Sequence, residues 1–384
     1  MSGRLPALQA PPAIRRRSHV ALRGGIALVA SAALALALLW PILQFFVDRG
    51  PQPAAAEERA RAAARAFLDR YVTADGRVVR PDQGGDSVSE GVSYALLLAQ
   101  VAGDERTFAD VWAWAERNLR TRDGLLAYLW ADGAVRDPNP ASDADLVTAL
   151  ALVRAGPDHA RAGRRLAAAV LARETVARRG ELLLAAGPWA TGEPVTLNLS
   201  YWVSIAYEQL ADRTGDPRWA ALADSSLRLT RELTNHGRIL PPDWARIDGG
   251  VAVPTPSPNR QAPDVRYGLD AQRLVVWLAS SCNPEARSLA ARFWPSLSQP
   301  GRAGALALRP DGTVADDRRN PMPLVAAAAA AGAAGLPGER DRLLAASELL
   351  NAANPTYYGA AWAALGRVLL TTSLLGGCAS QGAA

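Results

Sequence analysis

The stretch GGDSVSEGVSYALLLAQ, residues 84–100, changes within a few positions from a polar, glycine-containing loop into an Ala- and Leu-rich run. Ser87 or Ser89 would suit the N-cap of a helix that begins here, and an acid in the first turn complements the helix dipole. Glu90 therefore has a sufficient structural explanation as a helix-start residue. This stretch alone leaves open whether Glu90 also serves chemistry.

The same change from polar loop to apolar helix recurs along the chain. Ala/Leu/Arg-rich segments are separated by Gly, Pro, Asp and Asn, without a fixed-length repeat. Twelve such segments predict an all-α fold, in which paired helices form a closed ring of six hairpins with alternate helices inside. Residues 125–137, which alternate around an Asp-Gly pair, predict one small β-hairpin inserted in the ring. The expected helices cover 58–73, 90–102, 107–120, 142–155, 159–178, 198–213, 217–234, 267–280, 284–296, 321–333, 337–352 and 356–373.

In such a ring the inner helices all run the same way, so their N-termini meet at one end. Acidic and aromatic residues gather at the starts of the inner segments, whereas outer segments open on blander sequences such as DERTF and GDPRW. A carbohydrate cleft needs carboxylates for acid–base work and flat aromatic faces for sugar rings. Each residue taken alone is best explained as part of a helix start, and only their convergence favours a site. The set comprises Glu90, Tyr94, Asp143, Asp145, Asn198, Ser200, Tyr201, Trp202, Tyr267, Asp270, Arg273, Tyr357 and Tyr358.

The composition excludes several kinds of catalyst. All 42 basic residues are Arg, which excludes a Schiff-base lysine and the lysine of a phosphate-binding loop. The three His (His19, His159 and His236) and two Cys show no spacing typical of a zinc site or a Ser-His-Asp triad. Carboxylates are therefore the expected carriers of chemistry, without a metal or organic cofactor.

The basic charge is confined to the N-terminal end. Residues 1–47 hold five Arg and no acid, so the remaining residues balance to zero from the total of +5, which argues against a nucleic-acid partner. Residues 24–47 carry no charge and are long enough to cross a membrane, and the arginines before them place the N-terminus in the cytoplasm. We expect a cytoplasmic tail over 1–23, a membrane anchor over 24–47 and a linker over 48–57, with everything beyond outside the membrane, periplasmic or extracellular. The alternative is a signal peptide cleaved near PAAAE, which would release a secreted protein.

The two cysteines, Cys282 and Cys378, permit one disulfide in an exported protein, and nothing in the sequence requires it. The main domain is expected over 58–375, followed by a disordered tail over 376–384.

Five sequence blocks carry a resemblance to a known family. They are DGRVVRPDQGGDSVSEGVSYALLLA, AYLWADGAVRDPNPASDADLVTALAL, NLSYW, LPPDW and YGLDAQR. In order and spacing they resemble glycoside hydrolase family 8, and within it the endoglucanases that accompany bacterial cellulose synthesis. The resemblance covers roughly Arg65 to Arg367, and the combination of S-E-G-x-x-Y with A-S-D-A-D is its most specific part.

The resemblance implies an (α/α)6 barrel and cleavage of internal β-1,4 bonds in cellulose-like glucans with inversion at the anomeric carbon. It implies that Glu90 is the general acid and Asp270 the general base. Asp143 matches the acid that lies under the sugar at the cleavage point, where it binds and distorts the sugar ring. Asp143 is also our candidate for the group that keeps Glu90 protonated. Tyr201 matches a tyrosine that helps hold the attacking water.

Further matched positions are Arg273, one helical turn after the base, and the aromatic sugar contacts Tyr128 and Tyr358. Tyr94, Tyr201 and Arg273 are expected to bind substrate as well. The chain departs from the usual family pattern at Thr148, His159, Leu269 and Val276, and Tyr128 replaces a common Trp. The three acids are retained, so these departures bear on substrate choice more than on the reaction.

Three alternatives remain open. The domain could be an inactive, membrane-tethered glycan-binding module, or the same enzyme acting on xylan, chitosan or mixed-linkage glucan. It could also have a structural role in a polysaccharide synthase complex, with the membrane and the glycan as its partners.

Overall fold

The computed structural model describes residues 53–258 and 263–379. The chain divides into two compact units, residues 1–52 and 53–384, and the described residues all belong to the second. The predicted tail over 1–23 and membrane segment over 24–47 therefore lie outside the described residues. Among the helices that are described, none combines the length and the apolar composition needed to span a membrane.

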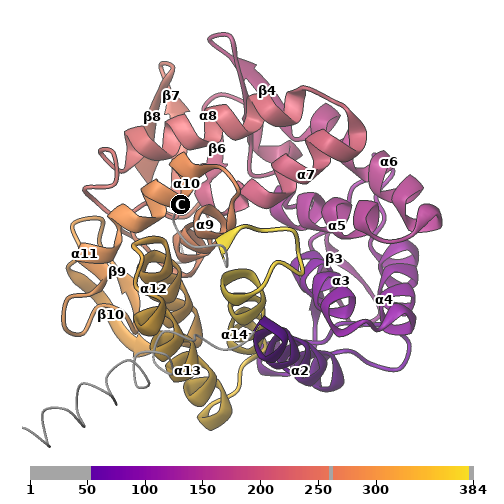
Figure 1. Ribbon diagram of the computed structural model, residues 1–384. Helices are drawn as coiled ribbons and strands as arrows, with labels where there is room; N and C mark the ends of the chain where they lie inside the picture. Colours follow the sequence, from indigo (N-terminus) through magenta and orange to yellow (C-terminus); the bar gives the residue numbers. More distant parts are fainter. Residues whose placement is uncertain (1–52, 259–262, 380–384) are drawn as a thin grey trace, which may run out of the picture. The chain divides into compact units, whose positions relative to one another are not determined.

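Six helices form an inner ring (Figure 1). Each packs against the next, and the last packs against the first, so the ring is closed. Most of these helices are rich in Ala, Leu and Val on all sides because protein surrounds them; α12, for example, buries eleven of its 13 residues, whereas α7 buries only four. Gly366 lets its helix approach the helix that carries Val325, since a Cβ at Gly366 would lie 2.3 Å from the Val325 side chain. The inner helices are α3 (Ser89–Ala102), α5 (Ser142–Arg154), α7 (Ser204–Thr214), α9 (Leu269–Ser280), α12 (Pro321–Ala333) and α14 (Tyr357–Thr371).

The outer helices pair with the inner ones and cover them, which confirms the alternation predicted from the sequence. They bury one apolar face and expose Arg, Asp and Glu on the other, as expected for helices between core and solvent. The twelve predicted helices are all present in the described part of the chain. The outer layer consists of α2 (Pro53–Tyr71), α4 (Glu105–Asn118), α6 (Pro157–Arg173), α8 (Arg218–Leu233), α10 (Pro284–Arg292) with the short α11 (Trp294–Leu297), and α13 (Pro337–Ala353).

Several predicted boundaries are wrong. Helix α2 begins at Pro53, inside the predicted linker, because its Ala-rich start buries Ala56 against the domain. The helix expected over 284–296 breaks after Arg292, since Pro295 has no N–H to continue the ladder. The helix expected from residue 198 starts at Ser204, and a 3₁₀ turn, η3 (Leu199–Tyr201), precedes it.

The predicted hairpin over 125–137 is confirmed, with Asp132 and Gly133 both at positive φ in its turn. Its first strand also pairs with β1 just before α3. The expectation of a single hairpin is wrong, because further short strands pair in the loops between helices, and residues 175–178 are a strand rather than the end of a helix. The strands are β1 (Ser87–Val88), β2 (Leu129–Ala131), β3 (Ala134–Asp137), β4 (Thr175–Arg178), β5 (Glu181–Leu184), β6 (Val195–Asn198), β7 (Trp244–Asp248), β8 (Val251–Thr255), β9 (Ala305–Leu308) and β10 (Val314–Arg319).

The C-terminal segment is attached to the domain. Cys282 and Cys378 form a disulfide, and the Cys378 N–H donates to the Ser280 carbonyl at 2.9 Å. The tail that was predicted to be disordered from residue 376 is therefore ordered as far as Ala379, because a covalent bond and a backbone hydrogen bond hold it.

Candidate active site

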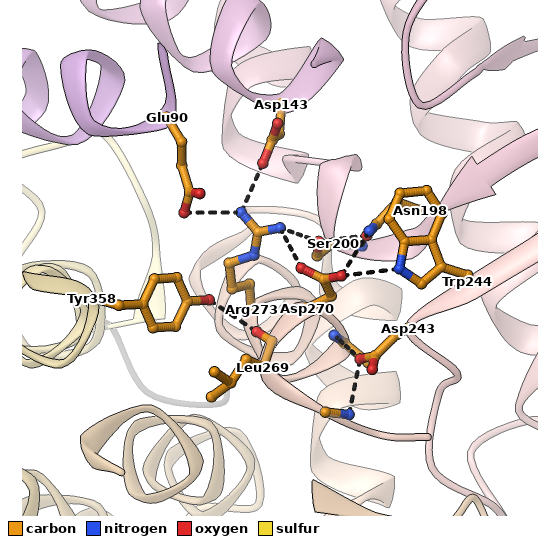
Figure 2. Close-up of polar contacts among 12 residues, drawn as sticks. Glu90, Asp143, Asn198, Ser200, Asp243, Trp244, Leu269, Asp270, Arg273 and Tyr358 are labelled. Atoms are coloured by element: carbon orange, nitrogen blue, oxygen red, sulfur yellow. Dashed lines mark hydrogen bonds and ion pairs between the residues drawn. The ribbon is translucent and has the colours of Figure 1, made fainter. Parts of the chain in front are cut away.

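A single buried guanidinium lies at the centre of the site. Arg273 sits one turn into α9, and its side chain is only 4% exposed. Figure 2 shows carboxylates from three different inner helices pointing at it. Its terminal nitrogens donate to Asp143 Oδ2 at 2.7 Å, Asp270 Oδ1 at 3.0 Å, Tyr94 Oη at 3.0 Å, Ser200 Oγ at 2.7 Å and, at 3.5 Å, Glu90 Oε1.

Glu90 lies in the first turn of α3, as predicted, with its side chain 19% exposed. The predicted serine cap is wrong: Val88 is the N-cap residue, and it makes no side-chain cap. The Ser87 hydroxyl instead accepts from Arg77 Nε at 2.9 Å. Strand β1 pairs with β2 directly before α3, and the Ser89 N–H donates to the Tyr128 carbonyl at 3.0 Å, so strand pairing rather than a cap precedes the helix that carries Glu90.

Asp143, in the first turn of α5, is the most deeply buried of the three acids, with 8% of its side chain exposed. Burial raises the pKa of Asp143 to about 6, against the opposing effect of the Arg273 charge, and the Glu90 carboxylate adds to the increase. Asp143 is thus an acid that changes its protonation state near neutral pH.

Asp270, in the first turn of α9, is the most accessible of the three acids, with 34% of its side chain exposed. Both of its oxygens are held. Oδ1 accepts from Arg273, and Oδ2 accepts from Asn198 Nδ2 and Trp244 Nε1, each at 3.1 Å (Figure 2). The sequence pointed to Asn198 only as a polar helix start, and the role of Trp244 within the LPPDW block was missed.

The three acids open into a cleft with a volume of about 370 Å³. Tyr128 and Tyr201 lie in its wall, as predicted, and Trp189 and Trp244 add aromatic surface that the sequence did not identify as part of the site. Trp189 directly follows Gly187 and Pro188, and a Trp beside such a turn was the signal available in the sequence. In the structure Trp189 is 47% exposed. The cleft is lined by Glu90, Tyr128, Asp137, Asn139, Pro140, Ala141, Asp143, Trp189, Tyr201, Trp244, Ser257, Asp270 and Arg273.

Two predicted contact residues lie behind this lining. Tyr94 is 2% exposed, and it meets the site only through its hydrogen bond with Arg273. Tyr358 is partly buried, and its hydroxyl donates to the carbonyl of Leu269 at 2.9 Å, next to the candidate base. Neither tyrosine belongs to the described lining: Tyr94 supports Arg273, and Tyr358 supports the backbone next to Asp270.

Tyr201 is well suited to remain a hydroxyl donor. Burial, followed by the charges of Asp143 and Asp270, raises the pKa of Tyr201 well above its usual value. Its ring also lies 5.5 Å from the Arg273 guanidinium carbon.

A second pair of acids is buried behind Asp143. Asp145 and Glu174 are both fully buried, and neither oxygen of Glu174 has a hydrogen-bond partner in the described structure. Burial raises the pKa of each well above its usual value, and the Asp145 charge raises that of Glu174 further. Among the described residues no group of three or more His, Cys, Asp or Glu side chains is arranged to hold a metal ion.

A helical barrel that brings three carboxylates to one end of an aromatic-walled cleft defines a candidate carbohydrate-cleaving enzyme. The sequence profile of glycosyl hydrolases family 8 matches residues 53–300, and the chain belongs to that family. The family predicted from the sequence blocks is thereby confirmed.

Individual relatives agree with this assignment. A probable endoglucanase of Novacetimonas hansenii is 34% identical over 248 residues, which cover 59% of this chain and 70% of the relative. An endoglucanase of Xanthomonas axonopodis is 34% identical over 61% of this chain and 63% of its own length. Among solved structures, the endo-beta-1,4-glucanase CMCax from Acetobacter xylinum superimposes with a TM-score of 0.65 at 30% identity, over 80% of this chain and 96% of that one.

Proposed function

We propose that this protein hydrolyses internal β-1,4 bonds of cellulose-like glucans as an endoglucanase. One observation carries the proposal: a single buried arginine gathers Glu90, Asp143 and Asp270 at the cleft. The names of the similar proteins, which are endoglucanases, support the same substrate class.

The reaction we propose is a single displacement with inversion. Asp270 takes a proton from a water molecule, the water oxygen bonds to the anomeric carbon, and the glycosidic C–O bond breaks as Glu90 gives its proton to the leaving oxygen. Asp143 holds sugar hydroxyls beneath the cleavage point, and Tyr201 orients the water.

The spacing of the acids is compatible with this reaction. The nearest oxygens of Glu90 and Asp270 lie 3.5 and 3.0 Å from different terminal nitrogens of Arg273. Because those nitrogens are about 2.3 Å apart in a planar guanidinium, the two oxygens are separated by less than about 9 Å. This upper limit overlaps the separation of about 6.5–9.5 Å that leaves room for water in inverting enzymes, and it also admits the separation of about 5–5.5 Å in retaining ones. The choice of inversion therefore rests on the family resemblance.

We also propose that the domain works outside the cytoplasmic membrane, anchored through residues 24–47. The Cys282–Cys378 disulfide supports this location, because disulfides persist in oxidising compartments. Action beside a polysaccharide synthase complex stays a prediction from the family resemblance.

The test is the release of reducing sugar from carboxymethylcellulose by the full chain, with Glu90→Gln and Asp270→Asn beside it. The matched control is Glu105→Gln, since Glu105 occupies the first turn of the outer helix α4 and is exposed. Loss of activity in the two site variants but not in the control, with unchanged circular dichroism, supports the assigned pair. NMR of the first product, with the α-anomer formed first, tests inversion.

Absence of activity on carboxymethylcellulose, but activity on xylan, chitosan or mixed-linkage glucan, would keep the mechanism and change the substrate. No activity on any of these glycans would favour the inactive binding module.

A further inference from the structure

We propose that Asp243 is a positioning residue for the reaction, which holds the general base Asp270 in place by capping the N-terminus of α9. The inference rests on the proposed function, in which Asp270 activates water. Asp243 does not line the cleft, so it acts through the helix that carries the base.

The cap comes from a distant part of the chain. Helix α9 has Gly268 at its N-cap, which offers no side chain to its free N–H groups. Asp243 Oδ1 accepts from the N–H of Gly268 at 2.8 Å and from that of Ala271 at 2.7 Å. These two amides flank Asp270, so a single carboxyl oxygen fixes the backbone on both sides of the base (Figure 2).

The same segment also holds the carboxyl of the base. Trp244, the next residue, donates its indole N–H to Asp270 Oδ2, and Asn198 donates to the same oxygen. Asn198 and Trp244 are directly paired across strands β6 and β7. The backbone N–H of Asp243 is bound to the Arg266 carbonyl at 2.7 Å. The paired residues Asn198 and Trp244 hold the side chain of Asp270. Asp243, directly before β7, holds the helix start.

The protonation state of Asp243 suits this role. Burial, followed by the charge of Asp270, raises the pKa of Asp243 to about 8. A protonated Asp243 still accepts both amides through Oδ1, and it adds no second negative charge beside the base. An asparagine at this position would present the same acceptor with the same charge.

Gly268 provides a second way to disturb the contact. A Cβ at Gly268 would lie 2.5 Å from Asp243 Oδ2. The φ angle of Gly268 is −110°, which any residue adopts, so an alanine there acts through this collision rather than through backbone strain.

The experiment compares kcat and KM of the full chain on carboxymethylcellulose for Asp243→Ala, Asp243→Asn and Gly268→Ala. We expect Asp243→Ala and Gly268→Ala to lower kcat about 10- to 100-fold, with KM changed less than about threefold, because a small displacement of a reacting group has effects of this size. Asp243→Asn should recover kcat to within about threefold of the wild type. If Asp243→Ala does not fold, Gly268→Ala and Asp243→Asn answer the same question.

The matched control is Asp104→Ala, which removes a side-chain cap from α4. Asp104 follows the C-terminal end of α3, whereas Glu90 lies in the first turn of that helix, and Asp104 does not line the cleft. It should lower the melting temperature without lowering kcat. The inference is overturned if Asp243→Ala and Gly268→Ala keep wild-type kcat while Asp270→Asn is inactive. It is also overturned if these two variants change only KM, or if Asp104→Ala lowers kcat as much as they do. An active Asp270→Asn would instead overturn the proposed function.

Discussion

The substitution Asp143→Asn should change how the stability of the protein depends on pH. The pKa of Asp143 is raised from 3.8 to about 6 in the folded state. For an acid with a raised pKa, the folded state binds the proton more tightly than the unfolded state does. Wild-type stability should therefore fall as pH rises through this interval, and Asp143→Asn, which has no proton to lose, should lack that fall.

The magnitude follows from the shift. At 1.36 kcal/mol per pKa unit, the wild type loses about 3 kcal/mol of unfolding free energy between pH 3 and pH 7.5, most of it between pH 4 and 6.5. Because Asp143 is buried, screening by solvent reduces this free-energy difference only slightly. For a domain of this size, 3 kcal/mol corresponds to about 4 °C in melting temperature.

Urea and thermal unfolding of both proteins between pH 4 and pH 7.5 would measure this difference. The advantage of Asp143→Asn over the wild type should grow with pH. A control of opposite sign is Asp104→Asn, because the hydrogen bonds from Thr107 lower the pKa of Asp104, so the contribution of its carboxylate is present at neutral pH and lost as pH falls. A difference between Asp143→Asn and wild type that is constant across the range would refute the reasoning.

Two further predictions concern groups outside the cleft. Glu174→Gln should fold normally, and its melting temperature should exceed that of the wild type by more as pH rises above about 5. The reason is that burial raises the pKa of Glu174, so its ionisation destabilises the folded wild type. Thermal scans from pH 5 to 9 that show no such trend would contradict this prediction. Replacing Cys282 and Cys378 together by Ser should lower the unfolding free energy by about 4.7 kcal/mol, because the disulfide closes a loop with a sequence separation of 96. Urea unfolding of the wild type with and without reductant checks this, and identical transitions would contradict it.

Much of the fold could be predicted from local patterns. Most inner helices are apolar on every side and the outer ones on one side, and this difference is visible in a window of three or four turns; the inner helix α7, with four buried residues, is the exception. Glu90, Asp143 and Asp270 could be placed in the first turns of inner helices because helix starts have local signals. Apart from the predicted hairpin over 125–137, the short strands were missed. Strand β6 pairs with β7 about fifty residues further on, which no local pattern shows. Strands β7 and β8 form a local hairpin around Gly249 and Gly250, whose turn signal was overlooked because each strand is only five residues long.

The site's support was equally invisible to local reasoning. Tyr94 was expected at the substrate, yet it lies under Arg273, because its place in the helix faces the ring interior. The cap that Asp243 places on α9 joins residues 25 and 28 positions apart, with no motif that links them. The disulfide was permitted by composition and decided only by the approach of the C-terminal segment to Cys282.

The sequence by itself determined the helices, their alternation and the three acids, because hydrophobic periodicity and helix-start chemistry act within a few residues along the chain. Only the tertiary structure decided that Arg273 would gather Glu90 from 183 positions away and Asp143 from 130. Closure of the helical ring brings those helix starts together, and burial there shifts the pKa of Asp143. Both effects depend on distances and solvent exclusion that exist only once the ring has closed.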